Sequence, residues 1–257
     1  MFHSWIRFAV RRTPLYAGLR FFRDRAAERA WLTHPERPGP APHRVKTRTL
    51  REYAQRYGMR TLIETGTFYG DTIWRLRNDF DRIVSIEIDP TLAAEARKRF
   101  KRHAHIEIVA GDSGIALEEV LGRTFDRCLF WLDGHYSGGI TGRGELDCPL
   151  VNELRHIWNH RVKNHVILVD DAREFIGVDG YPTIGRLEAT VKRQRPEWSF
   201  AVESDIIRIC PPIRPAVVEG AKHELFSKLL TQHHGDRLVR DTGRGYGTRR
   251  SPREHHR

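Results

Sequence analysis

The sequence predicts an α/β protein with a doubly wound, mostly parallel seven-stranded sheet whose last strand runs antiparallel to its neighbour. Strand-like apolar segments alternate with helix-like segments from about residue 45 to residue 212, as in parallel strands joined by right-handed helical crossovers. The last two strand-like segments are separated only by Glu203–Ser204, a connection short enough for a hairpin. Because ligands bind at the carboxyl ends of the strands in sheets of this kind, we expect the functional residues there.

Seven short apolar segments are predicted to form the strands. In chain order they are Thr61–Glu64, Ile83–Glu87, Ile106–Val109, Cys128–Leu132, Val166–Val169, Ser199–Val202 and Asp205–Ile209. Helices are predicted before and between them, at Lys46–Tyr57, Asp71–Asn78, Thr91–Phe100, Gly114–Leu121, Leu150–Arg161 and Ile184–Arg195. A chain of 257 residues is long enough for one such domain with a full core, which we place at residues 45–212.

The remaining segments are expected to be extensions of this domain. Residues 1–44 are predicted to hold one or two amphipathic helices followed by a proline-rich linker at His34–His43. A further helix is predicted within residues 213–234. The Gly- and Arg-rich residues 235–257 lack an apolar pattern and are expected to be disordered.

The net charge of +11 is concentrated at the two ends of the chain. Residues 1–48 carry 11 Lys and Arg against 3 Asp and Glu, and residues 237–257 carry 7 against 2, so the middle is close to neutral. That distribution does not favour a dedicated nucleic-acid surface. The basic ends are expected either to be solvated or to contact an anionic membrane through residues 1–33.

Cysteine usage and hydropathy predict a cytoplasmic protein. The three cysteines are odd in number and form no CxxC pair, which argues against a disulfide framework. No apolar run approaches the roughly 20 residues of a membrane span. Peripheral attachment to the inner face of a membrane is an open alternative, and the sequence leaves the oligomeric state open.

A glycine turn with the spacing E-x-G-x-x-x-G follows the first predicted strand. Gly66 allows a backbone conformation that is closed to other residues and a close approach to a ligand, and Gly70 lets the next helix begin near the strand. Together with Glu64 and Thr67, these glycines are candidates for cofactor binding. Two glycines after a strand are also typical of an ordinary tight turn.

The next two strands end in polar residues that suit the remainder of a nucleoside cofactor. Glu87 lies about 20 residues after the glycine turn, where an acidic side chain can accept both hydroxyls of an adenosine ribose. Gly111, Asp112 and Ser113 follow the third strand, where adenine would lie. A helix N-cap is an alternative role for Asp112 or Ser113.

Acidic residues follow the fourth and fifth strands. Asp133 follows one, and Asp170 and Asp171 follow the other, so neighbouring strands would bring three carboxylates together. Such a group repels itself unless a cation lies within it, and carboxylate oxygens suit Mg²⁺ or Mn²⁺. The ion could bind an acceptor hydroxyl and lower its pKa. Asp133 could instead contact the cofactor, and the aspartate pair could cap the following loop.

Three further side chains are candidates for the acceptor side of the site. His135 could be a general base or a metal ligand, because its usual pKa is near neutrality, or it could stabilise the loop. Tyr136 and Arg173 could contact the acceptor, although Arg173 could also pair with a nearby acid. The loop at residues 137–144 contains four glycines and is expected to be a mobile cover.

Taken together, these motifs resemble class I S-adenosylmethionine (SAM)-dependent methyltransferases over residues 45–212. The most similar pattern is that of the metal-dependent O-methyltransferases, such as the catechol and macrolide-sugar enzymes. The resemblance implies SAM as cofactor, bound by Glu64, Gly66, Gly70, Glu87, Gly111 and Ser113. It also implies a metal held by Asp133, Asp170 and Asp171.

More specific blocks of sequence point in the same direction. ETGTFYGDT, FWLDGHYSGG and VDDAR are similar to those of a group of uncharacterised bacterial proteins related to these enzymes. The catechol enzymes have a lysine base three residues after the acid of the fourth strand. This chain has Tyr136 there, so the resemblance does not assign the base.

The function predicted from the sequence is Mg²⁺-assisted O-methylation of a small-molecule or glycan-like hydroxyl acceptor. A non-catalytic SAM-fold module in a membrane-surface glycan-assembly complex is the alternative. Methylation of nucleic acid is a third reading, suggested by the basic charge. The loop sequence LDGHY lacks the aromatic-proline signature of enzymes that methylate exocyclic amines, and Cys148-Pro149 reverses the order used by cytosine-5 enzymes.

Overall fold

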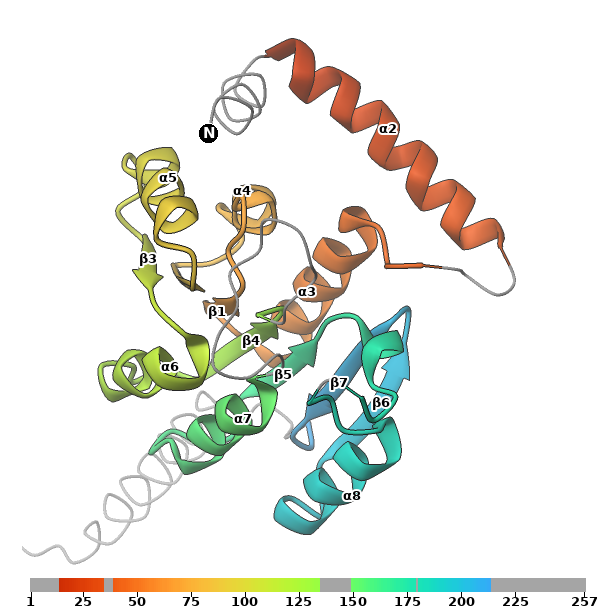
Figure 1. Cartoon of the computed structure of the whole chain (residues 1–257), viewed down its shortest axis with the longest axis vertical. Helices are drawn as coiled ribbons and strands as arrows, with labels where there is room; N and C mark the ends of the chain where they lie inside the picture. Colours follow the sequence, from red (N-terminus) through yellow and green to blue (C-terminus); the bar gives the residue numbers. More distant parts are fainter. Residues whose placement is uncertain (1–13, 35–38, 135–148, 179, 214–257) are drawn as a thin grey trace, which may run out of the picture. The chain divides into compact units, whose positions relative to one another are not determined.

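A seven-stranded sheet in the order β3-β2-β1-β4-β5-β7-β6 forms the centre of the protein (Figure 1). The computed structural model describes residues 14–34, 39–134, 149–178 and 180–213. The strands are β1 Thr61–Thr65, β2 Arg82–Glu87, β3 Ile106–Ala110, β4 Cys128–Leu132, β5 Val166–Val169, β6 Ser199–Glu203 and β7 Ile206–Cys210. β1 to β5 are parallel to one another, and β7 runs antiparallel to both β5 and β6. The predicted fold class is therefore confirmed.

Helices cover both faces of this sheet. They are α2 Pro14–Thr33, α3 His43–Tyr57, α4 Asp71–Leu76, α5 Pro90–Phe100, α6 Ser113–Gly122, α7 Leu150–Asn159 and α8 Ile184–Gln194, with a 3₁₀ turn η1 at Ala172–Glu174. Successive side chains of a strand point to opposite faces. Leu62 accordingly packs in a core with α3, α4 and α5, whereas Ile63 packs in a second core with α6, α7 and α8.

The helix before the first strand begins earlier than predicted. α3 begins at His43, three residues before the predicted start at Lys46, and Pro42 is its N-cap in an extended conformation. The helix begins where the prolines end, because proline lacks the N–H that a helix interior requires. Lys46 consequently lies within the first turns of α3, where its neighbours Val45 and Thr47 are buried.

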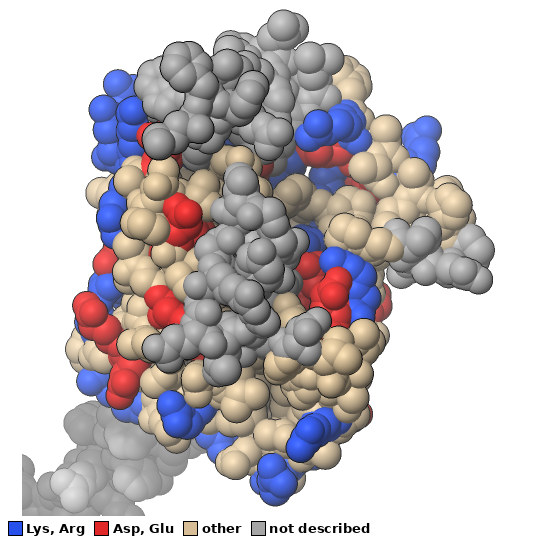
Figure 2. Space-filling model, in the orientation of Figure 1, with Lys and Arg blue, Asp and Glu red and all other residues tan. Residues whose placement is uncertain are grey.

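The extensions are described only in part. α2 lies within residues 1–33, where helices were predicted, and Trp31 near its end packs with Ala41 and Val45. Residues 1–13 and 214–257 lie outside the described residues, so the predicted C-terminal helix and tail stay predictions. In the part of the chain that the structure describes, no helix is both long and apolar enough to span a membrane. On the face seen in Figure 2, the described acidic and basic side chains are interspersed.

Two buried histidines tie β4 and β5 to the end of α7. His165 Nδ1 lies 3.0 Å from the Cys128 N–H and accepts its hydrogen bond, so the proton of this ring is on Nε2. Nε2 then donates to His160 Nδ1 at 2.9 Å, and His160 Nε2 donates to the Thr124 carbonyl at 3.0 Å. Every ring nitrogen is used with both histidines neutral, and burial lowers the pKa of His165 to about 3 and also lowers that of His160.

We expect this pair to make the protein acid-sensitive well above the range in which carboxylates titrate. Below pH 6.5 the unfolded chain binds a proton at His165 that the folded protein does not, so stability is fully present above pH 6.5 and is lost towards pH 3. Between pH 7 and pH 5 the loss from His165 amounts to about 2 kcal/mol. Urea unfolding at several pH values measures it.

The matched variants for this experiment are His165→Leu and His34→Gln. His165→Leu should flatten the dependence of the unfolding free energy on pH, whatever its effect on the absolute value. His34→Gln removes an exposed histidine and should retain the wild-type slope. An unchanged slope in His165→Leu would contradict the assignment of the effect to the buried pair.

Candidate cofactor and acceptor site

The register of the sheet brings the predicted site residues to one edge. Leu132 of β4 pairs with Thr65 of β1 and with Val169 of β5, so the residues that follow these three strands begin side by side. They are Gly66, Asp133 and Asp170. The Asp133 N–H donates to the Thr65 carbonyl at 3.1 Å, and the Asp170 N–H donates to the Leu132 carbonyl at 3.0 Å. The carboxyl ends of the central strands thus form a continuous row, as the fold class predicts.

Gly66 lies where a side chain cannot fit. Its φ of +84° is in the left-handed region, and a Cβ atom there would lie 2.2 Å from the Asp133 carbonyl oxygen. The Gly66 N–H donates to the Ile86 carbonyl of β2 at 2.9 Å. The turn therefore lies in close contact with the ends of both β2 and β4. Only glycine combines a left-handed backbone conformation with the absence of a Cβ atom.

The other end of the turn is fixed by Gly70 and Thr67. Gly70 is the N-cap of α4 with φ +71°, and a Cβ there would lie 2.7 Å from the Phe100 ring of α5. Thr67 is buried, and its hydroxyl lies 2.6 Å from that of Ser85 in β2. Gly70 thus lets α4 begin close to the Phe100 ring of α5, whereas the sequence analysis expected it to let the helix begin near the strand.

Glu64 is buried beneath the turn rather than exposed to a ligand. Its carboxyl accepts a hydrogen bond from the Ser85 hydroxyl at 2.6 Å. Burial raises the pKa of Glu64 well above its usual value, and the nearby charges of Asp133 and Glu87 add to the shift. A carboxyl that holds its proton can also donate a hydrogen bond, so Glu64 can link β1 and β2 without a buried charge.

Glu87 faces the same turn from the end of β2. One carboxylate oxygen accepts the Phe68 N–H at 2.6 Å, and the other accepts the Asp89 N–H at 2.9 Å. Glu87 as a whole residue is 4% exposed, and burial raises the pKa of its carboxyl although these hydrogen bonds oppose the shift. Glu87 is therefore a hydrogen-bond acceptor whose carboxylate is held in place by two backbone N–H groups.

The residues after β3 divide between structural and site roles. The Gly111 N–H donates to the Glu87 carbonyl at 2.9 Å, which continues the row of strand ends. Asp112 is the N-cap of α6 and accepts the Gly114 N–H at 2.8 Å, so its alternative role as a cap is the one observed. Ser113 is buried, and its hydroxyl would lie 3.2 Å from a Cβ at Gly134, next to the end of β4.

The three predicted carboxylates do come together. One oxygen each of Asp133, Asp170 and Asp171 lies within 4.8 Å of the others. Asp170 is fully buried, and one of its oxygens accepts the Asp171 N–H at 2.8 Å. Burial raises the pKa of Asp170 well above its usual value, and the charge of Asp133 adds to this. We call these three residues the acidic cluster.

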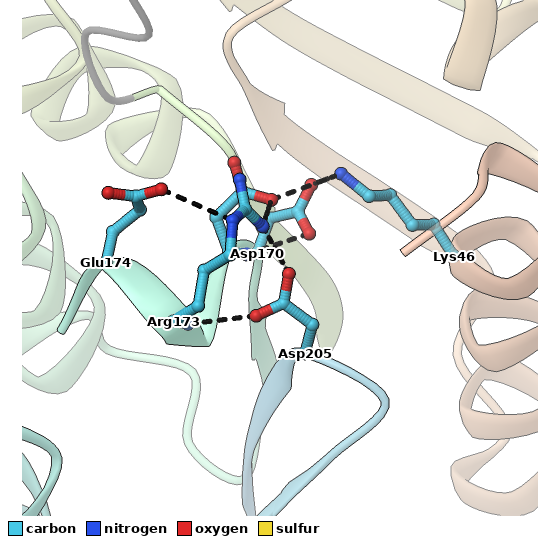
Figure 3. A network of polar contacts seen from close by, with 6 residues as sticks. Lys46, Asp170, Arg173, Glu174 and Asp205 are labelled. Carbon is cyan, nitrogen blue, oxygen red and sulfur yellow. Dashed lines mark hydrogen bonds and ion pairs between the residues drawn. The ribbon is translucent and has the colours of Figure 1, made fainter. Parts of the chain in front are cut away.

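A lysine that the sequence analysis did not single out lies in the acidic cluster. The Nζ atom of Lys46 contacts Asp170 Oδ2 and lies 3.5 Å from Asp171 Oδ1 (Figure 3). Burial on its own would lower the pKa of this ammonium, but attraction by Asp170, and next by Asp133, outweighs burial and raises it. Lys46 is 124 residues from Asp170 in the sequence, and no local pattern marks it as part of the site.

Arg173 of η1 is a second cation beside the cluster. Its Nη1 donates to Asp171 at 2.8 Å and contacts Asp205, and its Nε lies 3.3 Å from Glu174 (Figure 3). Asp205 belongs to the β6–β7 hairpin, where it and Ser204 both have positive φ. Of the two roles expected for Arg173, the structure shows pairing with acids.

Two candidates from the sequence lie outside the described residues. They are His135 and Tyr136, together with the predicted covering loop at residues 137–144. The description ends at Gly134 and resumes at Pro149. The base and acceptor roles of these residues therefore stay predictions.

Comparison with known proteins reveals similarity to solved structures in fold only. No protein-family model and no curated protein matches the chain. An O-methyltransferase from Bacillus cereus in complex with SAH is 16% identical, with 65% of this chain and 80% of that chain covered and a TM-score of 0.45. The SAH-bound methyltransferase PaMTH1 from Podospora anserina is 16% identical, over 73% and 86% of the two chains, with a TM-score of 0.47. The O-methyltransferase TomG from Streptomyces achromogenes, in complex with SAM, is 18% identical, over 73% and 90%, with a TM-score of 0.45.

Proposed function

We propose that this chain is a class I SAM-dependent methyltransferase that methylates a hydroxyl group of a small-molecule or glycan acceptor. The observation that carries the proposal is the row of strand ends at which the Gly66 turn and Glu87 adjoin the acidic cluster. The sheet order, with β7 antiparallel between β5 and β6, is the order of the class I methyltransferase fold.

The β1–β2 half of the site suits a nucleoside cofactor. Bare backbone at Gly66 lets a ligand approach the strand ends closely, since no side chain can fill that position. Glu87 is a fixed carboxylate at the end of the adjacent strand, which suits two ribose hydroxyls. Ser113 follows β3 at the start of α6, and its hydroxyl lies beside Gly134 at the end of β4, a position next to the Gly66 turn that supports its proposed contact with the cofactor.

The β4–β5 half of the site suits the acceptor. SAM supplies an activated methyl group, and its transfer to an oxygen is an in-line displacement that depends on how the acceptor is held. The acidic cluster and Lys46 can hold a hydroxyl next to the cofactor half, because Asp133 directly adjoins Gly66. His135 remains the proposed general base that takes the proton of the hydroxyl group. Tyr136 and Arg173 are the residues proposed to contact the molecule that is methylated.

The acidic cluster also has the composition of an Mg²⁺ site. Three carboxylate oxygens within 4.8 Å of one another are hard ligands of the kind that Mg²⁺ prefers. Asp133, Asp170 and Asp171 would hold the ion, which would supply charge to lower the pKa of an acceptor hydroxyl. Lys46 lies among the same oxygens, so the ion and the ammonium compete for them.

Isothermal titration with SAM tests the cofactor part of the proposal. The wild-type protein should bind SAM, and Glu87→Gln should bind it about 10- to 100-fold more weakly, because one charged acceptor of the ribose hydroxyls is replaced by an amide. The matched control is Glu118→Gln, which removes an exposed carboxylate from α6 and should bind like wild type. Absence of binding at millimolar SAM would remove the cofactor half of the proposal.

A further inference from the structure

The acidic cluster has a cation of its own. Three carboxylates in a largely buried site are accompanied by Lys46, whose side chain is 12% exposed, and by Arg173 at one edge. Arg173 is shared with Asp205 and Glu174, which lie outside the cluster. Of these two cations, Lys46 thus has the fewer acidic partners outside the three aspartates in the described part of the chain.

The position of Lys46 is imposed by the fold. Pro42 sets the start of α3, and the buried residues Val45, Thr47 and Leu50 fix the orientation of the first turns of this helix. Lys46, between two of these buried residues, is directed at Asp170, which follows β5 (Figure 3). The ammonium therefore reaches Asp170 from a rigid helix rather than from a loop.

Lys46 and a divalent ion need the same oxygen. Asp170 has one carboxylate oxygen engaged with the Asp171 N–H, and its other oxygen is the one that Lys46 contacts. Asp171 Oδ1 is likewise shared, because it lies 3.5 Å from Lys46 and 2.8 Å from Arg173. An ion held by this cluster would lie within a few ångströms of the ammonium, where two positive charges repel.

We infer that Lys46 is the resident cation of the acidic cluster and that a divalent ion binds there only by displacing it. The inference rests on the proposed function only in assigning the cluster to the acceptor side. Lys46 then limits the affinity of the site for metal, and the side chain can leave because it is partly open to solvent. In either state a cation lies among the three carboxylates and reduces their mutual repulsion.

Direct metal binding to the full-length protein tests the inference without SAM or an acceptor. Mn²⁺ titration, followed by calorimetry or by the EPR signal of free Mn²⁺, should show at least about tenfold tighter binding to Lys46→Met than to wild type. Lys101→Met removes a lysine at the exposed end of α5 and should bind Mn²⁺ like wild type. Equal or weaker binding to Lys46→Met, or no binding to either protein, would overturn the inference.

A second measurement uses the wild-type protein and does not depend on how the variant folds. Acetic anhydride modifies free lysine amines, and peptide mass spectrometry reports the modification at each site. Modification of Lys46 should be low without metal and should rise at least about threefold at saturating Mn²⁺, whereas Lys101 should not change. Unchanged Lys46 modification while Mn²⁺ binds would overturn displacement. Neither the Mn²⁺ titration nor the lysine modification depends on SAM binding. The proposed methyltransferase function and the proposed displacement of Lys46 can therefore be contradicted independently of each other.

Discussion

Replacing Gly66 with alanine is expected to abolish measurable SAM binding and to lower the free energy of unfolding by about 2–5 kcal/mol. The added Cβ would lie 2.2 Å from the Asp133 carbonyl oxygen, and the φ of +84° is costly for any residue with a Cβ. Relief of the clash has to separate the β1 turn from the end of β4, and these two segments join the proposed cofactor and acceptor halves of the site. Titration with SAM and urea unfolding of the variant measure the two effects.

Gly58→Ala is the matched control, because it separates backbone strain from the clash. Gly58 ends α3 with φ +65°, and a Cβ there would meet nothing within 4 Å. It should therefore cost only about 1–2 kcal/mol, with unchanged SAM affinity. If Gly66→Ala is no less stable than Gly58→Ala and binds SAM normally, the turn does not form the cofactor site.

Asp170→Asn is expected to reduce methyl transfer at least about 100-fold while leaving the protein folded. The amide keeps an oxygen for the Asp171 N–H but removes the charge that Lys46 contacts. Burial and the neighbouring Asp133 raise the pKa of Asp170, which means that its ionised form costs stability at neutral pH. Loss of the charge that Lys46 contacts lowers the free energy of unfolding, and removal of the buried charge opposes that change, so the variant should still unfold cooperatively.

Release of SAH from SAM in the presence of a hydroxyl acceptor that the wild-type protein methylates measures the change in activity, and urea unfolding measures stability. The control variant is Glu174→Gln, which also removes one carboxylate from the Arg173 network. Its side chain is 48% exposed and lies outside the acidic cluster, so activity should be retained. Asp170→Asn with more than half of the wild-type rate would show that the charge of the cluster does not serve the reaction.

The fold could be predicted from the sequence because its signals are local. Apolar strands separated by amphipathic helices and a two-residue connection before the last strand determine a doubly wound sheet with a hairpin. Predicted strand bounds differ from the observed ones by at most one residue at each end; β1, for example, ends at Thr65 rather than Glu64. The start of α3 was predicted three residues late because the spacing of apolar residues does not show where a helix begins after a run of prolines.

The acidic cluster could be predicted only in part. Asp133 and Asp170 follow adjacent parallel strands, so their meeting follows from the fold. Asp171 meets them because it adopts a φ of +52°, a conformation that no sequence pattern demands of an aspartate. Lys46 could not be predicted, because its approach depends on how α3 packs against the sheet, and that packing involves residues far apart in the chain.

The antiparallel insertion of β7 has a consequence for the order in which the chain can be completed during synthesis. β5 pairs with β4 on one side but has to wait for β7, some forty residues later, before its other edge is covered. The same late hairpin carries Asp205, the residue that contacts both the backbone and the guanidinium of Arg173. A nascent chain that ends before the hairpin therefore has an open β5 edge, which invites pairing with other chains. Its Arg173 also lacks the contacts with Asp205 and keeps only those with Asp171 and Glu174. Completion of the proposed acceptor side and coverage of the β5 edge thus occur in one late step.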